Sequence, residues 1–251
     1  MPNVYTGPYP ANCRNDCVSF TGLPIVQEAV AAASIGVVTV GHTNMWYIDG
    51  KYFEQYNTVA TSVVAPTFGA GANGGLNIGA LTAANSKEIE ITQGNSTSIK
   101  NAFLVGTSPA FFVRATFRIP TLANATEVSV GFRKQASYTA SPLSTYTDYA
   151  IMGVHLTAGE LYTQTGIAST YVVTDTTQAV TAATNFTIQV NVSAAGAVTY
   201  LWGSGNGVLA APTTTVAATM GAVTMIPWIH VTMASGANGE VDLVSYACGL
   251  L

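Results

Sequence analysis

Alternation of apolar and polar residues in several short segments after residue 80 constrains the fold most. In 111–119, FFVRATFRI, an apolar side chain occupies every second position. The same alternation recurs in 127–134 and 185–192. A period of two places successive side chains on opposite faces of a β-strand. Short strands with one apolar face each, joined by Gly, Asn and Ser turns, predict an all-β antiparallel sandwich of two packed sheets.

Two further strands are predicted near the end of the chain, at 228–233 and 240–246. The sequence between them, ASGANG at 234–239, has the composition of a hairpin turn. We therefore expect these last two strands to form a hairpin.

The beginning of the chain has a different character. Four prolines interrupt residues 1–24, so this stretch is expected to be irregular. Asp49 and Gly50 form a turn pair between the aromatic segments 45–48 and 51–56. Aromatic strands on either side of an Asp-Gly pair predict a β-hairpin.

A soft domain boundary follows this hairpin. Residues 65–80, rich in Gly, Ala and Asn, have the composition of a linker or extended loop. We therefore divide the chain into an N-terminal attachment and assembly arm, 1–75, and a β-sandwich, 76–251.

Charged residues make up only 8% of the chain, whereas an ordinary soluble domain has about 25%. All eight bases lie in the first 134 residues, and 135–251 contain five acids and no base. A surface with so little charge is expected to be covered in a homo-oligomer, with a trimer favoured, or in a larger particle. The alternative is a monomer that Thr, Ser, Asn and Gly keep hydrated.

The charge balance and the hydropathy pattern also exclude several partners. A sequence pI of about 5.2 argues against nucleic acid, which is bound by clustered Lys and Arg. The most apolar stretch, 30–48, is interrupted by polar residues and lacks the run of about 20 that a membrane helix needs. The N-terminus has no cationic start followed by an apolar core, as a secretory signal would have. We expect a protein made in the cytoplasm with neither a nucleic-acid nor a membrane partner.

Three segments carry a resemblance to a known family. They are FFVRATFRIPTLANATEVSVGFRK at 111–134, YAIMGVHLTAGELYTQTG at 149–166 and NFTIQVNVSAAGAVTYLW at 185–202. The region from about residue 76 to 251 resembles the concanavalin-like jelly-roll domains, related to laminin-G and lectin sandwiches, of bacteriophage structural proteins. The resemblance implies a jelly-roll fold and a place in the virion after synthesis in the host cytoplasm. It carries over no catalytic residue.

Glycoside hydrolysis is the enzymatic reaction that such a fold makes worth testing, and it needs two carboxylates across a sugar cleft. Glu88 and Glu90 share one face of a predicted strand. Retaining hydrolases of the concanavalin-like class typically carry an E-x-D-x-x-E pattern on one strand. The corresponding segment here, KEIEITQG, has Glu90 where the Asp is expected and Gln93 where the last Glu is expected. We therefore predict no enzymatic activity and interpret the two carboxylates as a solvated strand face beside Lys87.

Other catalytic and metal-binding arrangements have weaker support. The chain has no G-x-S-x-G motif, and the histidines are far apart in sequence, so His155 and His230 are interpreted as half-buried strand residues. Calcium needs clustered oxygen ligands, and the late acids form no D-x-D loop. We predict no cofactor and no metal site.

Two groups of residues are candidates for binding. Arg114 and Arg118 share one strand face, and Arg133 and Lys134 lie on a strand that we expect to be its neighbour. Together they would form a basic patch for a capsid or subunit contact. A glycan site is the other candidate, because aromatic rings stack on sugars and carboxylates accept their hydroxyl hydrogens. Its expected residues are Tyr146, Asp148, Tyr149 and Trp202.

The first functional hypothesis is a non-enzymatic virion structural protein, either a capsid decoration (cement) protein or a head fibre. It would bind the major capsid protein or another virion protein of the assembled shell and oligomerise. The alternative is a glycan-binding tail-fibre or receptor-binding module that takes a host glycan, with Tyr138 and Tyr162 among its aromatic residues. A polysaccharide hydrolase ranks third.

Overall fold

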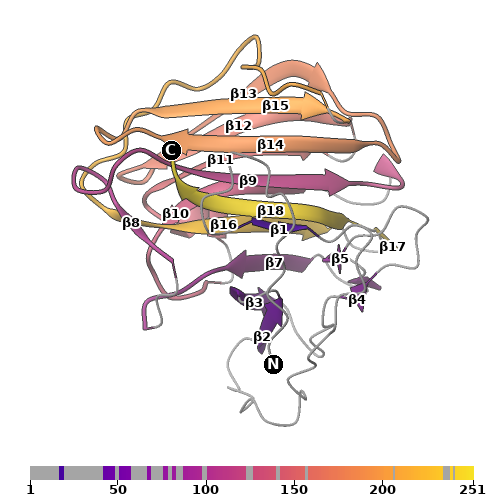
Figure 1. The fold of residues 1–251 in the computed structure, drawn as a ribbon, viewed down its shortest axis with the longest axis horizontal. Helices are drawn as coiled ribbons and strands as arrows, with labels where there is room; N and C mark the ends of the chain where they lie inside the picture. Colours follow the sequence, from indigo (N-terminus) through magenta and orange to yellow (C-terminus); the bar gives the residue numbers. More distant parts are fainter. Residues whose placement is uncertain are drawn as a thin grey trace, which may run out of the picture.

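The computed structural model describes the chain in ranges separated by gaps. These ranges are 17–19, 42–48, 51–57, 67–68, 76–78, 81–82, 87–97, 101–122, 127–139, 142–155, 158–205, 207–233, 238–239 and 241–251. Within them the chain forms two packed antiparallel sheets, a short two-stranded sheet and one helical turn (Figure 1). The helical turn is α1 (Pro142–Thr145), and the short sheet pairs β17 (Asn238–Gly239) with β6 (Leu81–Thr82).

The first sheet has seven strands in the order β15-β14-β9-β18-β5-β4, with β1 also paired to β18. In Figure 1, β14, β9 and β18 lie in front of the fainter strands β12, β11 and β10 of the other sheet. The strands are β15 (Val198–Ser204), β14 (Asn185–Val192), β9 (Phe111–Arg118), β18 (Asp242–Leu250), β5 (Leu76–Asn77), β4 (Thr67–Phe68) and β1 (Cys17–Ser19).

The second sheet has nine strands in the order β13-β12-β11-β10-β16-β7-β3-β2, with β8 also paired to β16. Its strands are β13 (Thr170–Ala179), β12 (Glu160–Ile167), β11 (Tyr149–His155), β10 (Glu127–Lys134), β16 (Thr224–Met233), β7 (Lys87–Thr92), β3 (Lys51–Asn57), β2 (His42–Ile48) and β8 (Phe103–Leu104).

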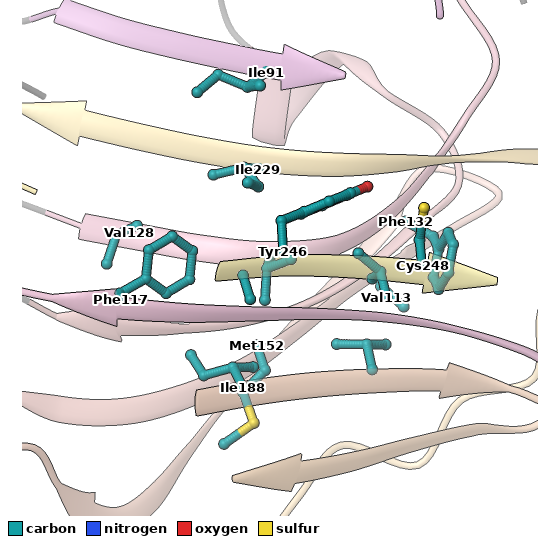
Figure 2. Close-up of a cluster of buried hydrophobic side chains, with 14 of the residues drawn as sticks. Ile91, Val113, Phe117, Val128, Phe132, Met152, Ile188, Ile229, Tyr246 and Cys248 are labelled. Atoms are coloured by element: carbon teal, nitrogen blue, oxygen red, sulfur yellow. The ribbon is translucent and has the colours of Figure 1, made fainter. Parts of the chain in front are cut away.

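The main hydrophobic core lies between the two sheets, and Figure 2 shows buried side chains of both sheets meeting there. Alternate residues of β9 and β10 point into it, as the period of two predicts; Phe111 and Phe132 are fully buried and meet edge-to-face at 4.9 Å. Burial of one face of each strand drives the two sheets together. The predicted antiparallel jelly-roll sandwich is confirmed.

The pairing of strands differs from the sequence expectation in two places. β9 and β10 lie in different sheets, so the expectation that they are neighbours is wrong. β16 and β18 also lie in different sheets, so the predicted hairpin of the last two strands is wrong. A strand in either sheet of a sandwich has the same alternation of apolar and polar residues, so periodicity does not indicate which strands pair.

The early hairpin is confirmed. β2 and β3 pair antiparallel from His42 opposite Asn57 to Ile48 opposite Lys51. β3 in turn pairs with β7, where Glu54 lies opposite Thr92. Strands from the predicted N-terminal arm therefore belong to both sheets, since β1 also pairs with β18.

Much of the predicted irregular stretch 1–24 and of the predicted linker 65–80 lies outside the described residues. The boundary near residue 75 stays a prediction. In the described part of the chain, no helix is long and apolar enough to cross a membrane.

Candidate functional site

The polar side chains of interest gather on one surface, the outer face of the nine-stranded sheet. This is the face that points away from the seven-stranded sheet. Along β10, Val128, Val130 and Phe132 point into the main core, so Ser129 and Arg133 point to the outer face.

Part of the outer face is closed by an aromatic cluster. Its buried members are Tyr146, Tyr149, Ile151, Tyr162 and Trp228. Both Tyr146 and Tyr149 meet the Trp228 ring edge-to-face, at centroid distances of 5.7 and 5.8 Å. Segment 134–147, which contains α1, supplies Tyr146 and packs Ala136 and Leu143 on the cluster. This segment therefore covers one half of the outer face.

A buried ion pair lies beneath this cover. Glu90 on β7 and Arg133 on β10 are both 0% exposed, and Arg133 Nε lies 3.2 Å from Glu90 Oε2. The Tyr146 hydroxyl lies 3.0 Å from each oxygen of the same carboxylate and donates to it. Burial raises the pKa of Glu90, and the positive charge of Arg133 opposes this rise. The Glu90 carboxylate is thus occupied by protein groups.

Glu54 on β3 extends this network. Asn95 Nδ2 donates to Glu54 Oε2 at 2.6 Å, and the Tyr138 hydroxyl donates to the same oxygen at 3.0 Å. The Tyr138 ring also stacks on Tyr56 at 4.7 Å. Burial, with the Glu54 charge as the second cause, raises the pKa of Tyr138 far above its usual value, so its hydroxyl stays a donor. These contacts fasten segment 134–147 to the sheet.

Another part of the outer face carries polar side chains. Strand register sets four residues side by side across four strands: His155 lies opposite Glu127, Glu127 opposite Thr232, and Thr232 opposite Glu88. We call these four residues the polar row. The side chains of His155, Glu127 and Glu88 are 30%, 23% and 29% exposed, so solvent reaches them. Three strand spacings make the row about 14 Å long.

Neighbouring groups fix the His155 end of the polar row. His155 Nδ1 lies 2.9 Å from Glu127 Oε1, and its Nε2 lies 3.5 Å from Asp175 Oδ1 on β13. The imidazole also stacks on the Tyr162 ring at 4.2 Å, and the Tyr162 hydroxyl donates to Glu127 Oε2 at 3.4 Å. A side chain held on both edges and one face is pre-organised for binding.

His230 contacts Glu88 at the other end of the polar row. It is 1% exposed, and its Nε2 lies 3.4 Å from Glu88 Oε2. In the described part of the chain, His230 Nδ1 and Trp228 Nε1 are buried without a hydrogen-bond partner. This part of the sheet therefore keeps hydrogen-bonding capacity that its own side chains do not use.

The structure separates the residues expected to form a glycan site. Tyr146 and Tyr149 lie on the outer face, but burial among other aromatic residues leaves no ring face for a sugar. Asp148 accepts a hydrogen bond from the backbone N–H of Ala168 at 3.3 Å, and its carboxylate lies 3.6 Å from Lys134 Nζ. It therefore links the turn at Ala168 to the end of β10. Trp202 lies on β15 of the other sheet and packs against the main core.

The expected basic patch is also divided. Arg114 and Arg118 lie on β9, whereas Arg133 and Lys134 lie on β10 of the other sheet, so the four residues do not form one surface. Arg118 lies 3.5 Å from Asp242 Oδ2, and Arg133 is fully buried. A partner contact through the exposed members stays a prediction.

The two carboxylates of β7 have different environments. Both point to the outer face, but only Glu88 is solvated; the interpretation of Glu90 as solvated is wrong, because Arg133 and Tyr146 enclose it. Gln93 instead accepts from Cys248 Sγ, at 3.0 Å, within the interior. No carboxylate takes the place of the third acid.

Sequence reasoning did not select Glu127 and Asp175 as partners of His155. The three residues come from β10, β13 and β11, and no local spacing relates them. Only the strand register brings Glu127 opposite His155.

Among the described residues, no group of three or more His, Cys, Asp or Glu side chains is placed to hold a metal ion.

Comparisons with known proteins bear on the fold. No family model matches the sequence, and no curated protein matches it. A protein of unknown function from Shewanella oneidensis MR-1 has a similar structure, with 13% identity, a TM-score of 0.52 and coverage of 90% of this chain and 94% of that one.

Two lectin-type structures are also similar. The legume lectin-like domain from Entamoeba histolytica has 7% identity, a TM-score of 0.51 and coverage of 79% of this chain and 90% of that one. The exoplasmic/lumenal domain of VIP36, solved with Ca²⁺ and Man3GlcNAc, has 8% identity, a TM-score of 0.50 and coverage of 70% and 78%. Nothing in these three likenesses points to a phage protein. The chain therefore has the legume-lectin-like, concanavalin-like jelly-roll fold.

Proposed function

We propose that this protein is a non-enzymatic carbohydrate-binding module and that the polar row is its binding surface. The observation that carries the proposal is the partly exposed row of two carboxylates, a histidine and a hydroxyl on the outer face. Glu88 and Glu127 accept hydrogen bonds from sugar hydroxyls, and Thr232 both donates and accepts. Polar groups already fixed in place bind at a lower entropic cost than mobile ones.

The extent of the polar row supports a ligand with several hydroxyl groups along its length. The row crosses four strands and is about 14 Å long. Asp175, which is 64% exposed, continues it beyond His155 toward the edge of the sheet. A single small polar ligand would leave most of these acceptors unused, whereas an oligosaccharide reaches them together.

The environment of Glu90 argues against Glu88 and Glu90 as the pair of carboxylates of a glycosidase. A glycosidase needs a second carboxyl group at the scissile bond. The second carboxylate of β7 is 0% exposed and paired with Arg133, so it has no access to a sugar. The glycan in the VIP36 structure, Man3GlcNAc, makes mannose-type oligosaccharides the first ligands to test.

A glycan array followed by titration calorimetry tests this proposal. Glu127→Gln keeps the shape of the side chain but removes the charge, and His155→Ala removes the ring. We expect each variant to bind the best wild-type ligand at least about tenfold more weakly, because one charge-assisted hydrogen bond contributes that much. Arg114→Gln, on the other sheet, is the matched control and should bind as the wild type does.

Two results would contradict the proposal. One is the absence of any glycan ligand for the folded wild-type protein. The other is unchanged binding by both Glu127→Gln and His155→Ala, because a different surface would then hold the sugar.

The setting in which the module works is a narrower proposal. The family resemblance and the scarce charge support a tail fibre or receptor-binding protein of a virion, with a host glycan as its ligand. The alternative role in a virion is capsid decoration, with the major capsid protein as partner. Imaging of particles with and without the protein would distinguish a tail from a shell position.

A further inference from the structure

One edge of the nine-stranded sheet ends in a long strand that is open to a partner. β13 lies at the end of the strand order, at the top of the view in Figure 1, and pairs with β12 along one edge. Among the described residues, no strand pairs with its other edge. Backbone N–H and C=O groups along such an edge are available to another strand.

The first half of β13 is also apolar and exposed. Tyr171, Val172 and Val173 are 39%, 43% and 52% exposed. Native edge strands are commonly protected by Lys, Pro or short length. β13 has ten residues without Lys, Arg or Pro, and its one charge is Asp175. We name Thr170–Thr174 the edge segment.

We propose that the edge segment pairs with the edge segment of a second copy of this chain, antiparallel and about a two-fold axis at Val172. In this register Val172 faces its own counterpart, Tyr171 faces Val173, and Thr170 faces Thr174. Aromatic with β-branched pairs and Thr with Thr pairs are favourable across antiparallel strands. One surface is thus complementary to itself, as a two-fold interface requires.

The distribution of charge along β13 is compatible with pairing to a second copy of the chain. Asp175 lies three residues from the axis, so the two copies of Asp175 are separated by about 20 Å along the strands. That distance exceeds the Debye length of about 8 Å at physiological ionic strength, so the two acids repel only weakly. The apolar centre of the interface contains no charge.

The proposed dimer has a consequence for ligand binding. Residues opposite each other in a paired sheet point to the same face, so both outer faces of the dimer lie on one side of a continuous sheet. Two polar rows then face the same way and can engage a multivalent ligand together. Self-association itself does not depend on the proposed glycan binding.

Sedimentation velocity over a range of protein concentrations tests the pairing. We expect the wild-type chain to dimerise. Val172→Lys places two like charges opposite each other at the axis and should weaken the dimer about tenfold or more. Val208→Lys is the matched control, because Val208 is 93% exposed and lies outside the edge segment, and it should dimerise as the wild type does.

A cysteine at the axis tests the register. Opposed Cα atoms in an antiparallel pair lie about 4.5–5.5 Å apart, which a disulfide can span. Under mild oxidation, Val172→Cys should therefore form a covalent dimer beyond the wild-type background, and Val208→Cys should not. A wild-type chain that stays monomeric at about 0.1 mM, or a dimer that Val172→Lys does not weaken, would overturn the proposal.

Discussion

Glu90 shows how the environment of one side chain determines its role. Its neighbour on the same face of the strand, Glu88, is 29% exposed, whereas Glu90 is fully buried. Arg133 approaches its carboxylate, and Tyr146 donates a hydrogen bond to it. Breaking a buried ion pair by removing one partner typically costs about 3–5 kcal/mol, because the other charge is left without compensation. Glu90 therefore stabilises the fold, whereas Glu88 is partly exposed at the surface.

The raised pKa of Glu90 predicts a pH dependence of stability. Burial holds the pKa of the folded state above the ordinary value of 4.5, so the folded protein keeps this proton at a pH where the unfolded chain has lost it. The stability that Glu90 contributes is fully present below pH 4.5 and falls as the pH rises through the folded-state pKa. Relative to Glu90→Gln, which does not titrate, the wild-type protein should lose unfolding free energy as the pH rises above 4.5, the ordinary pKa of the carboxyl group.

Urea unfolding at several pH values measures this difference. Glu160→Gln, an exposed substitution on the same sheet, is the control for removal of a charge. An unfolding free energy of the wild-type protein that rises with pH relative to that of Glu90→Gln would show that the prediction has the wrong sign.

At the scale of elements, β10 and β11 lie so close together at Gly131 that no side chain fits between them. Gly131 on β10 lies opposite Ile151 on β11. A Cβ added to Gly131 would lie 1.9 Å from the backbone oxygen of Ala150, which cannot move without distorting the strand. The close approach of the two strands that carry Glu127 and His155 thus requires a residue without a side chain at position 131.

Gly131→Ala should therefore destabilise the protein. Overpacking of an interior position costs about 1–3 kcal/mol, and here the obstacle is backbone. Gly221→Ala is the matched control, since a Cβ there meets no atom within 4 Å. Thermal or urea unfolding measures both variants, and equal stability of the two would contradict this account of the close approach.

At the scale of the whole molecule, strands from the first 75 residues belong to both sheets. Phe53 on β3 is 1% exposed and meets Tyr246 of β18 edge-to-face at 5.3 Å. Glu54, the next residue, accepts hydrogen bonds from Asn95 and Tyr138. A segment interpreted from composition as an attachment arm thus also contributes to the core.

Removal of residues 1–75 should accordingly destabilise the sandwich. The loss of one buried Phe alone costs about 3–5 kcal/mol. Circular dichroism during heating would show a lower Tm for the 76–251 fragment, whereas removal of residues 1–16 alone keeps β1, β2 and β3 and should have a smaller effect. A 76–251 fragment as stable as the full chain would instead support an independent arm.

The sequence by itself determined strands such as β9, β10 and β14 and their apolar faces, because alternation is a local property of each segment. It also determined the hairpin of β2 and β3, since a short turn fixes the pairing of adjacent strands. Only the tertiary structure decided that β9 and β10 belong to different sheets. It also brought Glu90 to Arg133 and Asp175 to His155. Alternation is the same in both sheets of a sandwich, so contacts between distant residues depend on a strand order that no local pattern encodes.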